Sequence, residues 1–285
     1  MDRIFSNRAA GGRCLADKLA VYSARPGLIV LAVPHGGVPV AAEVAHRWHV
    51  PLDVLEVRKF NAPEDCTVSA ALLPEICLPE SARGSRGFSG LGLAWRESTP
   101  VVRSPLNRRR KLLPFSAEKM EPFSPEFGFG AVASGDFRVL NRAAPNVAVV
   151  KREVIEAVTA RELKVLHRRE WMHRHGRPAL ELRNRTVILV DDVIVTGSTM
   201  RVAVAALREA GVGAIIVATP VAAREAYMEL RDRVNGFVTL RLPREFGRIG
   251  HYYTDFESVS DAAVRRQLDF AWQENIAVTS GSDAS

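Results

Sequence analysis

The alternation of apolar and polar positions divides the first part of the chain into strand, turn and helix. Leu28 to Pro34 is an apolar run that leads into a glycine-rich turn and then a segment with apolar residues at helical spacing. A second apolar run covers Pro51 to Val57 and ends on the basic pair Arg58 and Lys59. This order predicts a βαβ unit, which favours a parallel sheet with helices on its faces.

The same alternation returns in the second half of the chain. The expected elements are a hairpin turning at Gly135 and Asp136, a helix from about Val150 to His173, a strand from Thr186 to Val190, a helix from Thr199 to Ala210, a strand from Ala214 to Val221, a helix from Arg224 to Val234, a strand from Gly236 to Leu242 and a last helix from about Asp261. The predicted fold class is therefore α/β, with a mainly parallel sheet flanked by helices.

One long stretch, residues 64–121, has scattered prolines, glycines and serines and no sustained period of either strand or helix. It is predicted to be an irregular insertion, either a disordered excursion or a sequence foreign to the fold. Residues 1–63 and 122–276 then form a single domain. The remaining residues, 277–285, are expected to be a disordered tail.

Composition narrows the class of protein without naming a function. The 285 residues are 47% hydrophobic and 25% charged, which excludes collagen-like, coiled-coil and wholly disordered chains. We expect no secretion and no membrane insertion, because the start of the chain lacks an apolar signal region and no apolar run approaches the length of a membrane helix. Three cysteines without CxxC spacing suggest neither a disulfide framework nor a zinc site, so a reducing cytoplasm is expected.

The formal net charge of +7 makes phosphorylated ligands or nucleic acid plausible partners. The basic cluster Arg108 to Lys111 lies in the irregular stretch and could contact RNA or DNA. A solvated charge run is the better explanation of that cluster, so a nucleic acid partner is not favoured.

The strongest chemical signal is TVILVDDVIVTGSTM, residues 186–200. A strand delivers two consecutive carboxylates, Asp191 and Asp192, and four further positions begin a helix: Thr196, Gly197, Ser198 and Thr199. Hydroxyls and unpaired backbone N–H groups at a helix start bind anions, and paired acids can accept hydrogen bonds from ribose hydroxyls and help to hold a divalent cation. Simple capping of a loop and a helix is the alternative for either half alone.

A second signal is VPHGGVP, residues 33–39, in which a strand ends on Gly36 and Gly37. Two glycines expose backbone amides, as a loop that grips a diphosphate requires. By itself this could equally be an ordinary strand-to-helix turn.

Together these segments resemble the type I phosphoribosyltransferase family, whose signature for phosphoribosyl pyrophosphate (PRPP) is two acids, a short apolar stretch and TGxT. The chain is also similar to bacterial predicted phosphoribosyltransferases that read PRGGVPVAAEVA and then a strand ending in RK. His35 stands where those relatives have arginine. The resemblance covers roughly residues 5–63 and 124–270, and the insertion splits a loop that would lie near the active site.

The resemblance implies transfer of 5-phosphoribosyl from PRPP to a nitrogenous, nucleobase-like acceptor with release of pyrophosphate. It implies that Asp191 and Asp192 hold the ribose and Mg²⁺ as catalytic and metal-binding residues, and that Thr196 to Thr199 bind the 5′-phosphate. The implied pyrophosphate-binding residues are His35, Gly36, Gly37, Arg58 and Lys59. No residue identifies itself as a general base.

The acceptor site is less clear. The loop of residues 243–256 gathers aromatic side chains, of which Phe246, Tyr252 and Tyr253 are candidate stacking partners for a heterocycle. Packing of these rings onto the core is an equally good explanation.

Two alternatives to an active transferase stay open. One is a PRPP-sensing or nucleic-acid-binding regulator on the same fold with little catalysis, and the other is loss of activity through the insertion. The identity of the acceptor and the oligomeric state are not encoded in any motif, so a homo-oligomer is left open.

Overall fold

The computed structural model describes residues 5–60, 129–141 and 152–282. The chain divides into two compact units, which we describe separately: unit 1 comprises residues 1–56 and 168–285, and unit 2 comprises residues 57–167. The predicted insertion, residues 64–121, and its basic cluster lie outside the described residues.

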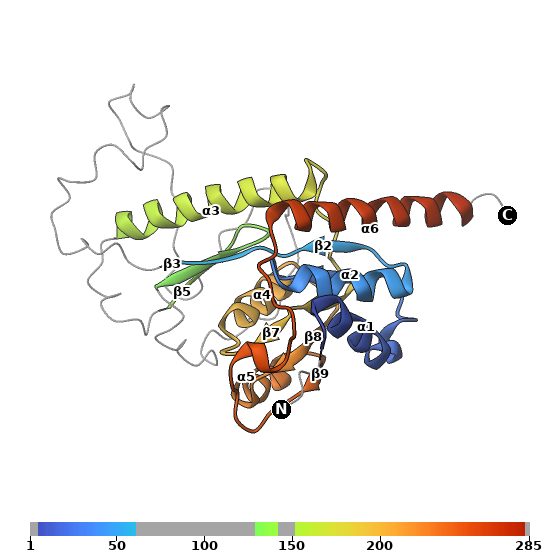
Figure 1. The fold of residues 1–285 in the computed structure, drawn as a ribbon. Coiled ribbons are helices and arrows are strands. Elements are labelled where there is room, and N and C mark those ends of the chain that lie inside the picture. The colour runs from blue at the N-terminus through green and yellow to red at the C-terminus, as the bar shows by residue number, and fades with distance from the viewer. Residues whose placement is uncertain (1–4, 61–128, 142–151, 283–285) are drawn as a thin grey trace. The chain divides into compact units, whose positions relative to one another are not determined.

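Unit 1 is built on a six-stranded parallel sheet with the order β2-β1-β6-β8-β7, in which β9 also pairs with β8 (Figure 1). Its strands are β1 (Leu28–Ala32), β2 (Leu52–Val54), β6 (Thr186–Val190), β7 (Val193–Ile194), β8 (Ala214–Ala222) and β9 (Gly236–Arg241). The central strand β1 pairs with β2 on one side and with β6 on the other, where Ala32 lies opposite Val190. Strand order therefore reverses between β1 and β6, and open parallel sheets bind ligands beyond the strand ends at such a point.

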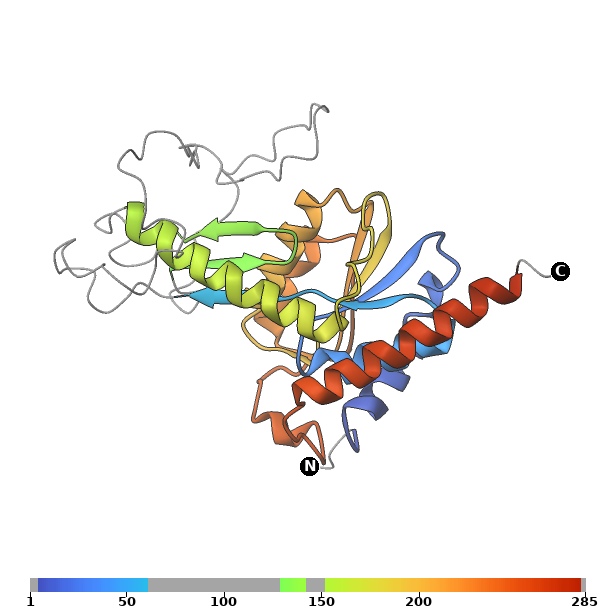
Figure 2. The same ribbon diagram turned by 90° about the horizontal axis from the view of Figure 1, so that it is seen from above.

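Both faces of this sheet are covered by helices. One face packs against α1 (Arg8–Lys18), α2 (Gly37–Trp48) and the start of α6 (Asp261–Ser282), in a core that contains Leu15, Val44, Ile188 and Leu268. Val187 and Leu189, which alternate with Ile188, point to the other face and are also fully buried. Figure 2 shows α4 (Ser198–Glu209) on the opposite side of the strands from α6. Burial of both faces explains why β6 reads as an unbroken apolar run.

Unit 2 has a three-stranded antiparallel sheet of β3 (Val57–Phe60), β4 (Gly130–Ala133) and β5 (Phe137–Leu140). The predicted hairpin is confirmed, and its turn residues Gly135 and Asp136 both have positive φ. The first part of α3 (Arg152–Arg174) packs on Phe60 and Val132 through Leu163 and Leu166. The boundary between the two units falls inside α3.

The predicted elements and the observed ones differ in several places. Pro51 to Val57 does not form one strand. Its first part contains β2, which joins the parallel sheet of unit 1. Its last residue, Val57, begins β3 of unit 2, which also contains Arg58 and Lys59. The last helix continues to Ser282, so the predicted disordered tail from residue 277 is helical over most of its length. The helix α1 was not predicted, because RAAGGRCLADK has little apolar periodicity.

The remaining elements are α5 (Arg224–Leu230), which was predicted to be longer, and short 3-10 turns at Ala20–Tyr22, Arg231–Arg233 and Ile249–His251. None of the helices in the described ranges combines the length and the hydropathy that crossing a lipid bilayer requires.

Candidate functional site

The loops that follow β1 and β6 meet where the strand order of unit 1 reverses. The loop after β1 carries His35, Gly36 and Gly37, and the loop after β6 carries Asp191 and Asp192. Val33 donates its N–H to the carbonyl oxygen of Val190, at 2.9 Å, so the two chain segments are joined at the start of these loops. The two strongest sequence signals therefore lie at one place in the fold.

The two glycines allow this close approach. A Cβ atom on Gly36 would lie 2.0 Å from Oδ2 of Asp192, and one on Gly37 would lie 2.6 Å from the carbonyl oxygen of Val190. The Gly37 N–H donates to the carbonyl oxygen of Val33, at 3.1 Å. Gly37 is also the first residue of α2. The lack of side chains at these two glycines thus allows the loop with the carboxylates to approach closely. In this conformation the Gly37 N–H is already hydrogen-bonded.

Asp191 and Asp192 lie in different settings although they are adjacent. Asp191 is half-buried, and burial together with the neighbouring charge of Asp192 holds the pKa of its carboxyl well above the usual value, while Arg8 partly offsets this rise. Asp192 is 9% exposed and accepts a charge-assisted hydrogen bond from Nε of Arg8, at 2.7 Å. Two adjacent carboxylates that share one cation have the chemistry to accept sugar hydroxyls or a hard divalent cation.

Arg8 was missed by sequence reasoning, because it lies 184 positions from its partner. Its guanidinium also donates to the carbonyl oxygen of Glu257, at 2.6 Å, and lies 3.7 Å from the centroid of the Phe256 ring. An arginine at the start of a helix with little apolar periodicity gives no sequence signal that it reaches the acids.

The segment Thr196 to Thr199 begins helix α4, as the sequence predicted. Gly197 has a φ of 71° and is the N-cap, and the hydroxyls of Thr196 and Ser198 lie 3.1 Å apart. Val195 and Thr196 are exposed, so the loop before the helix is open to solvent. A helix start with converging hydroxyls and a left-handed glycine suits a phosphate group.

The aromatic loop is packed differently from an open stacking wall. Tyr252 and Tyr253 are 8% and 1% exposed and form a buried cluster with Phe5, against which Phe246 packs. The Tyr253 hydroxyl donates to the carbonyl oxygen of Asp192, at 2.8 Å, and burial raises the pKa of that hydroxyl well above its usual value. Tyr253 thus holds the loop that carries Asp192 through this hydrogen bond. The acceptor role of Phe246 and Tyr252 stays a prediction.

Arg58 and Lys59 belong to β3 in unit 2. The Arg58 guanidinium lies 2.7 Å from a carboxylate oxygen of Glu162, whose side chain is 6% exposed. This buried ion pair is a sufficient structural reason for Arg58, and a contact of either residue with diphosphate stays a prediction.

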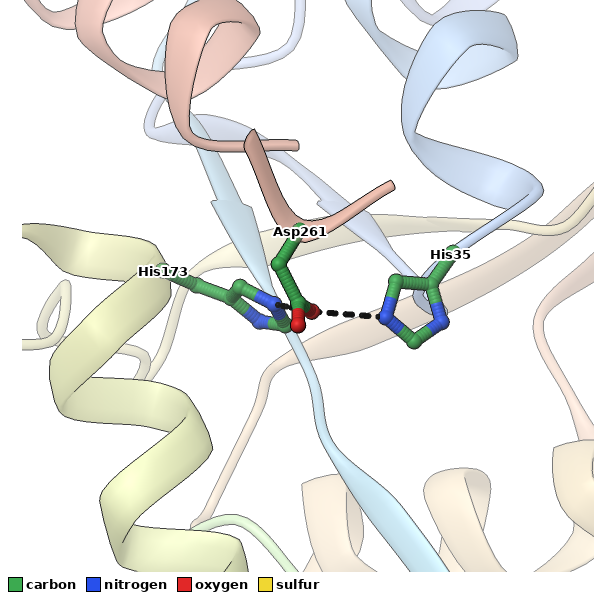
Figure 3. A group of neighbouring side chains, drawn as sticks. All are labelled: His35, His173 and Asp261. Carbon is green, nitrogen blue, oxygen red and sulfur yellow. Dashed lines mark hydrogen bonds and ion pairs between the residues drawn. The ribbon is translucent and has the colours of Figure 1, made fainter. Parts of the chain in front are cut away.

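His35 is held by residues that sequence reasoning did not identify. Its Nε2 lies 2.8 Å from Oδ1 of Asp261, and Nε2 of His173 lies at the same distance from the same oxygen. Nδ1 of His173 lies 2.7 Å from Oε1 of Glu56. Figure 3 shows the Asp261 carboxylate between the two rings.

These contacts set the charges of the cluster. Burial lowers the pKa of His173, but its hydrogen bonds with Glu56 and Asp261 outweigh burial and raise the pKa overall. The hydrogen bond with His173, followed by that with His35, lowers the pKa of Asp261. His35 was predicted as a contact of diphosphate, and the structure places it between that loop and the start of α6.

Two pockets of the described residues lie away from these loops. One of about 310 Å³ in unit 2 is lined by residues such as Arg138 and His167, and one of about 370 Å³ lies at the amino end of β1 beside Gly27. Neither pocket is lined by the residues that meet at the switch point, so the candidate site is defined by its side chains and not by a cavity.

Comparison with known proteins agrees with this geometry. Residues 132–243 match the family model described as "Phosphoribosyl transferase domain". Two curated proteins of Mycobacterium tuberculosis, "Putative phosphoribosyl transferase MT0597" of strain CDC 1551 / Oshkosh and "Putative phosphoribosyl transferase Rv0571c" of strain H37Rv, are each 28% identical over 272 residues, which is 95% of this chain and 48% of theirs. The chain thus spans about half the length of these relatives.

Among solved structures, the protein TT1426 from Thermus thermophilus is 30% identical, with a TM-score of 0.62. The alignment covers 93% of this chain and 97% of that one.

Proposed function

Since the chain belongs to the type I phosphoribosyltransferase family, we propose that it transfers the 5-phosphoribosyl group of PRPP to a nitrogenous, nucleobase-like acceptor and releases pyrophosphate. The observation that carries this proposal is the close approach of the Gly36–Gly37 loop to the carboxylates Asp191 and Asp192 at the switch point. The start of α4 follows these acids a few residues later in the chain.

Each element has a part suited to its chemistry. The carboxylates of Asp191 and Asp192 would accept hydrogen bonds from the two ribose hydroxyls. The backbone N–H groups and hydroxyls of Thr196 to Thr199 would bind the 5′-phosphate at the helix start. The Gly36–Gly37 loop would lie against the diphosphate, with Arg8 limiting the negative charge of the acids.

Mg²⁺ fits the donor set of this site. Asp191 and Asp192 offer hard oxygen ligands. Burial, and after it the charge of Asp192, raises the pKa of Asp191, and a bound cation would favour its ionised form. When bound, Mg²⁺ would neutralise charge on the leaving diphosphate. The protein's own residues would hold the ribose in the orientation that the reaction requires.

In the proposed reaction, the bond between C1 of the ribose and the diphosphate oxygen breaks, and the diphosphate leaves with the electron pair. A bond from the acceptor nitrogen to C1 forms, and the nitrogen loses a proton to solvent.

A second candidate function is PRPP sensing with little catalysis. The observation that favours it is that His35 is tied to Asp261 and the Gly37 N–H to Val33, so part of the diphosphate loop is already engaged. The same binding site would then report PRPP without transferring its sugar.

One experiment separates the two candidates. PRPP binding is measured by calorimetry with Mg²⁺, and pyrophosphate release is measured across a panel of nucleobases. Release with at least one acceptor supports the transferase, whereas binding without any release supports the sensor. A chain that binds no PRPP contradicts both.

The matched test of the site is Asp191→Asn together with Asp192→Asn. The amides keep the size of the acids but remove their charge, so we expect PRPP affinity to fall by at least about 100-fold. Asp232→Asn, at a carboxylate that is 77% exposed in the 3-10 turn after α5, is the control and should bind PRPP as the unaltered chain does. Wild-type affinity of the double variant would refute the ribose assignment.

A further inference from the structure

A second cluster of polar side chains lies beside the candidate site and includes His35, the residue predicted to contact diphosphate. It joins the loop after β1 through His35, the end of α3 through His173, and the first residue of α6 through Asp261. Figure 3 shows the three side chains converging from these separate elements. Three segments far apart in sequence thus present one potential ligand atom each to the same small volume.

The geometry of these atoms is that of a closed triangle. Oδ1 of Asp261 lies 2.8 Å from Nε2 of His35 and 2.8 Å from Nε2 of His173, and the three atoms lie within 4.8 Å of one another. Ligand atoms in a tetrahedral zinc site are about 3.3 Å apart, since each lies about 2.0 to 2.1 Å from the ion. Asp261 and His35, whose side chains are 46% and 33% exposed, have the freedom to adjust these distances around the buried His173.

The side chain that orients His173 is also placed as in a metal site. His173 is fully buried, and its Nδ1 faces the buried carboxylate of Glu56, at 2.7 Å. Histidines that bind metals through one ring nitrogen usually donate the other N–H to a carboxylate, which fixes the tautomer and the ring orientation. Glu56 would hold Nε2 of His173 as the free ligand nitrogen in this way.

We propose that His35, His173 and Asp261 bind one divalent transition-metal ion of the zinc class through Nε2, Nε2 and Oδ1. Imidazole nitrogens suit zinc and its neighbours, whereas Mg²⁺ takes oxygen ligands, so this ion is distinct from the magnesium of the proposed transfer. The ion replaces the protons that the two Nε2 atoms share with Asp261. Three protein ligands leave a fourth position for water or an anion.

Other histidine–carboxylate pairs in unit 1 show what distinguishes this cluster. His46 faces Glu274 and His175 faces Asp269, each through one ring nitrogen and one acid. Within the described ranges, His35, His173 and Asp261 are the group of three such residues whose ligand atoms converge. His46 therefore provides a matched control, because it keeps the imidazole–carboxylate contact without a third ligand.

The test uses the full chain after treatment with a chelator. Zn²⁺ is added, excess ion is removed by gel filtration, and bound zinc is measured by elemental analysis; Co²⁺ is used separately, since its visible absorption reports tetrahedral coordination. We expect one ion per chain, at least 10-fold weaker binding in His35→Gln and Asp261→Asn, and unchanged binding in His46→Gln. Glu56→Gln should weaken binding by about 10- to 100-fold, as for other groups that orient a ligand.

The outcomes are decisive in both directions. Asp261→Asn changes a half-exposed side chain, so it reports on binding even if variants of the buried His173 do not fold, and thermal melting verifies its fold. Absence of zinc from the unaltered chain, or stoichiometric zinc in both His35→Gln and Asp261→Asn, overturns the site. Asp191→Asn with Asp192→Asn should still bind zinc, so failure of the proposed transferase and failure of the zinc site are distinguishable.

Discussion

Two carboxylates of unit 1, Asp191 after β6 and Asp261 at the start of α6, have pKa shifts in opposite directions. Asp191 is desolvated beside another acid, which raises its pKa, whereas Asp261 lies between two imidazoles that lower its pKa. The negative charge near Asp191 is only partly balanced, which suits a ligand that brings hydroxyls or a hard cation. The charge of Asp261 is balanced by two imidazole rings, whose protons a softer metal ion can replace. Gly36 and Gly37 lie against the loop of Asp191 and Asp192 and directly follow His35, which contacts Asp261.

Among single substitutions, the largest fall in PRPP affinity is expected from Gly37→Ala. Its Cβ would lie 2.6 Å from the backbone oxygen of Val190 and 3.0 Å from Cα of Asp191, so the two loops must separate. We expect a loss of about 1 to 3 kcal/mol in the free energy of unfolding and a fall of about 100-fold in PRPP affinity. Denaturant unfolding and calorimetry measure these. Gly250→Ala, where a Cβ meets nothing within 4 Å, is the control.

Arg8→Gln tests how the acidic region is compensated. Arg8 and Asp192 are each 12% exposed at the side chain, and removing one partner of a largely buried pair leaves an uncompensated charge. We expect the free energy of unfolding to fall by about 3 kcal/mol, and the raised pKa of Asp191 to rise further. If Arg8→Gln costs as much in an Asp192→Asn background as in the unaltered chain, the pair is not coupled.

The same chemical change should have opposite effects in the two regions of the metal-free protein at neutral to mildly acidic pH. Asp191→Asn should stabilise the fold at pH 7, because a carboxyl whose folded pKa is raised by burial and by the charge of Asp192 lowers the free energy of unfolding as pH rises through that pKa. Asp261→Asn should destabilise by less than about 1 kcal/mol, since solvent screens this exposed group. Unfolding as a function of pH measures both.

The pH windows follow from the directions of the shifts. The contribution of Asp261 is present above about pH 4 and is lost as pH falls through its lowered folded pKa. The contribution of His173 is complete below about pH 6.5 and is lost as pH rises through its raised folded pKa. Asp261→Asn should therefore be most harmful between these limits, and equal effects across pH 3 to 8 would contradict the assignment.

A small effect is also expected from Tyr253→Phe. It removes the hydrogen bond from the Tyr253 hydroxyl to the carbonyl oxygen of Asp192 but keeps the ring in its buried cluster. We expect a loss of about 1 kcal/mol in the free energy of unfolding and a modest fall in PRPP affinity. Tyr252→Ala, which removes a ring, tests the stacking hypothesis separately: a raised KM for an identified acceptor with unaltered PRPP affinity would support it.

Much of the parallel sheet could be predicted, because burial on both faces leaves long apolar runs. The strand Thr186 to Val190 has the predicted bounds, and the hairpin at Gly135 is where the turn residues indicated it. The split of Pro51 to Val57 between two sheets could not be predicted. A short apolar run indicates that a strand is buried but not which partner it pairs with. β2 pairs with residues 22 positions away, whereas β3 pairs with residues 70 to 76 positions away.

By itself the sequence determined the strand-loop segments that carry chemistry: the acids after β6, the hydroxyl-rich start of α4 and the glycines after β1. These are local, because a strand end, a turn and a helix start are each specified within a few residues. Only the tertiary structure decided that Arg8 pairs with Asp192, that Tyr253 supports the acidic loop, and that His35 meets His173 and Asp261. These contacts join residues 61 to 226 positions apart, and folding alone brings such residues within the range of a hydrogen bond.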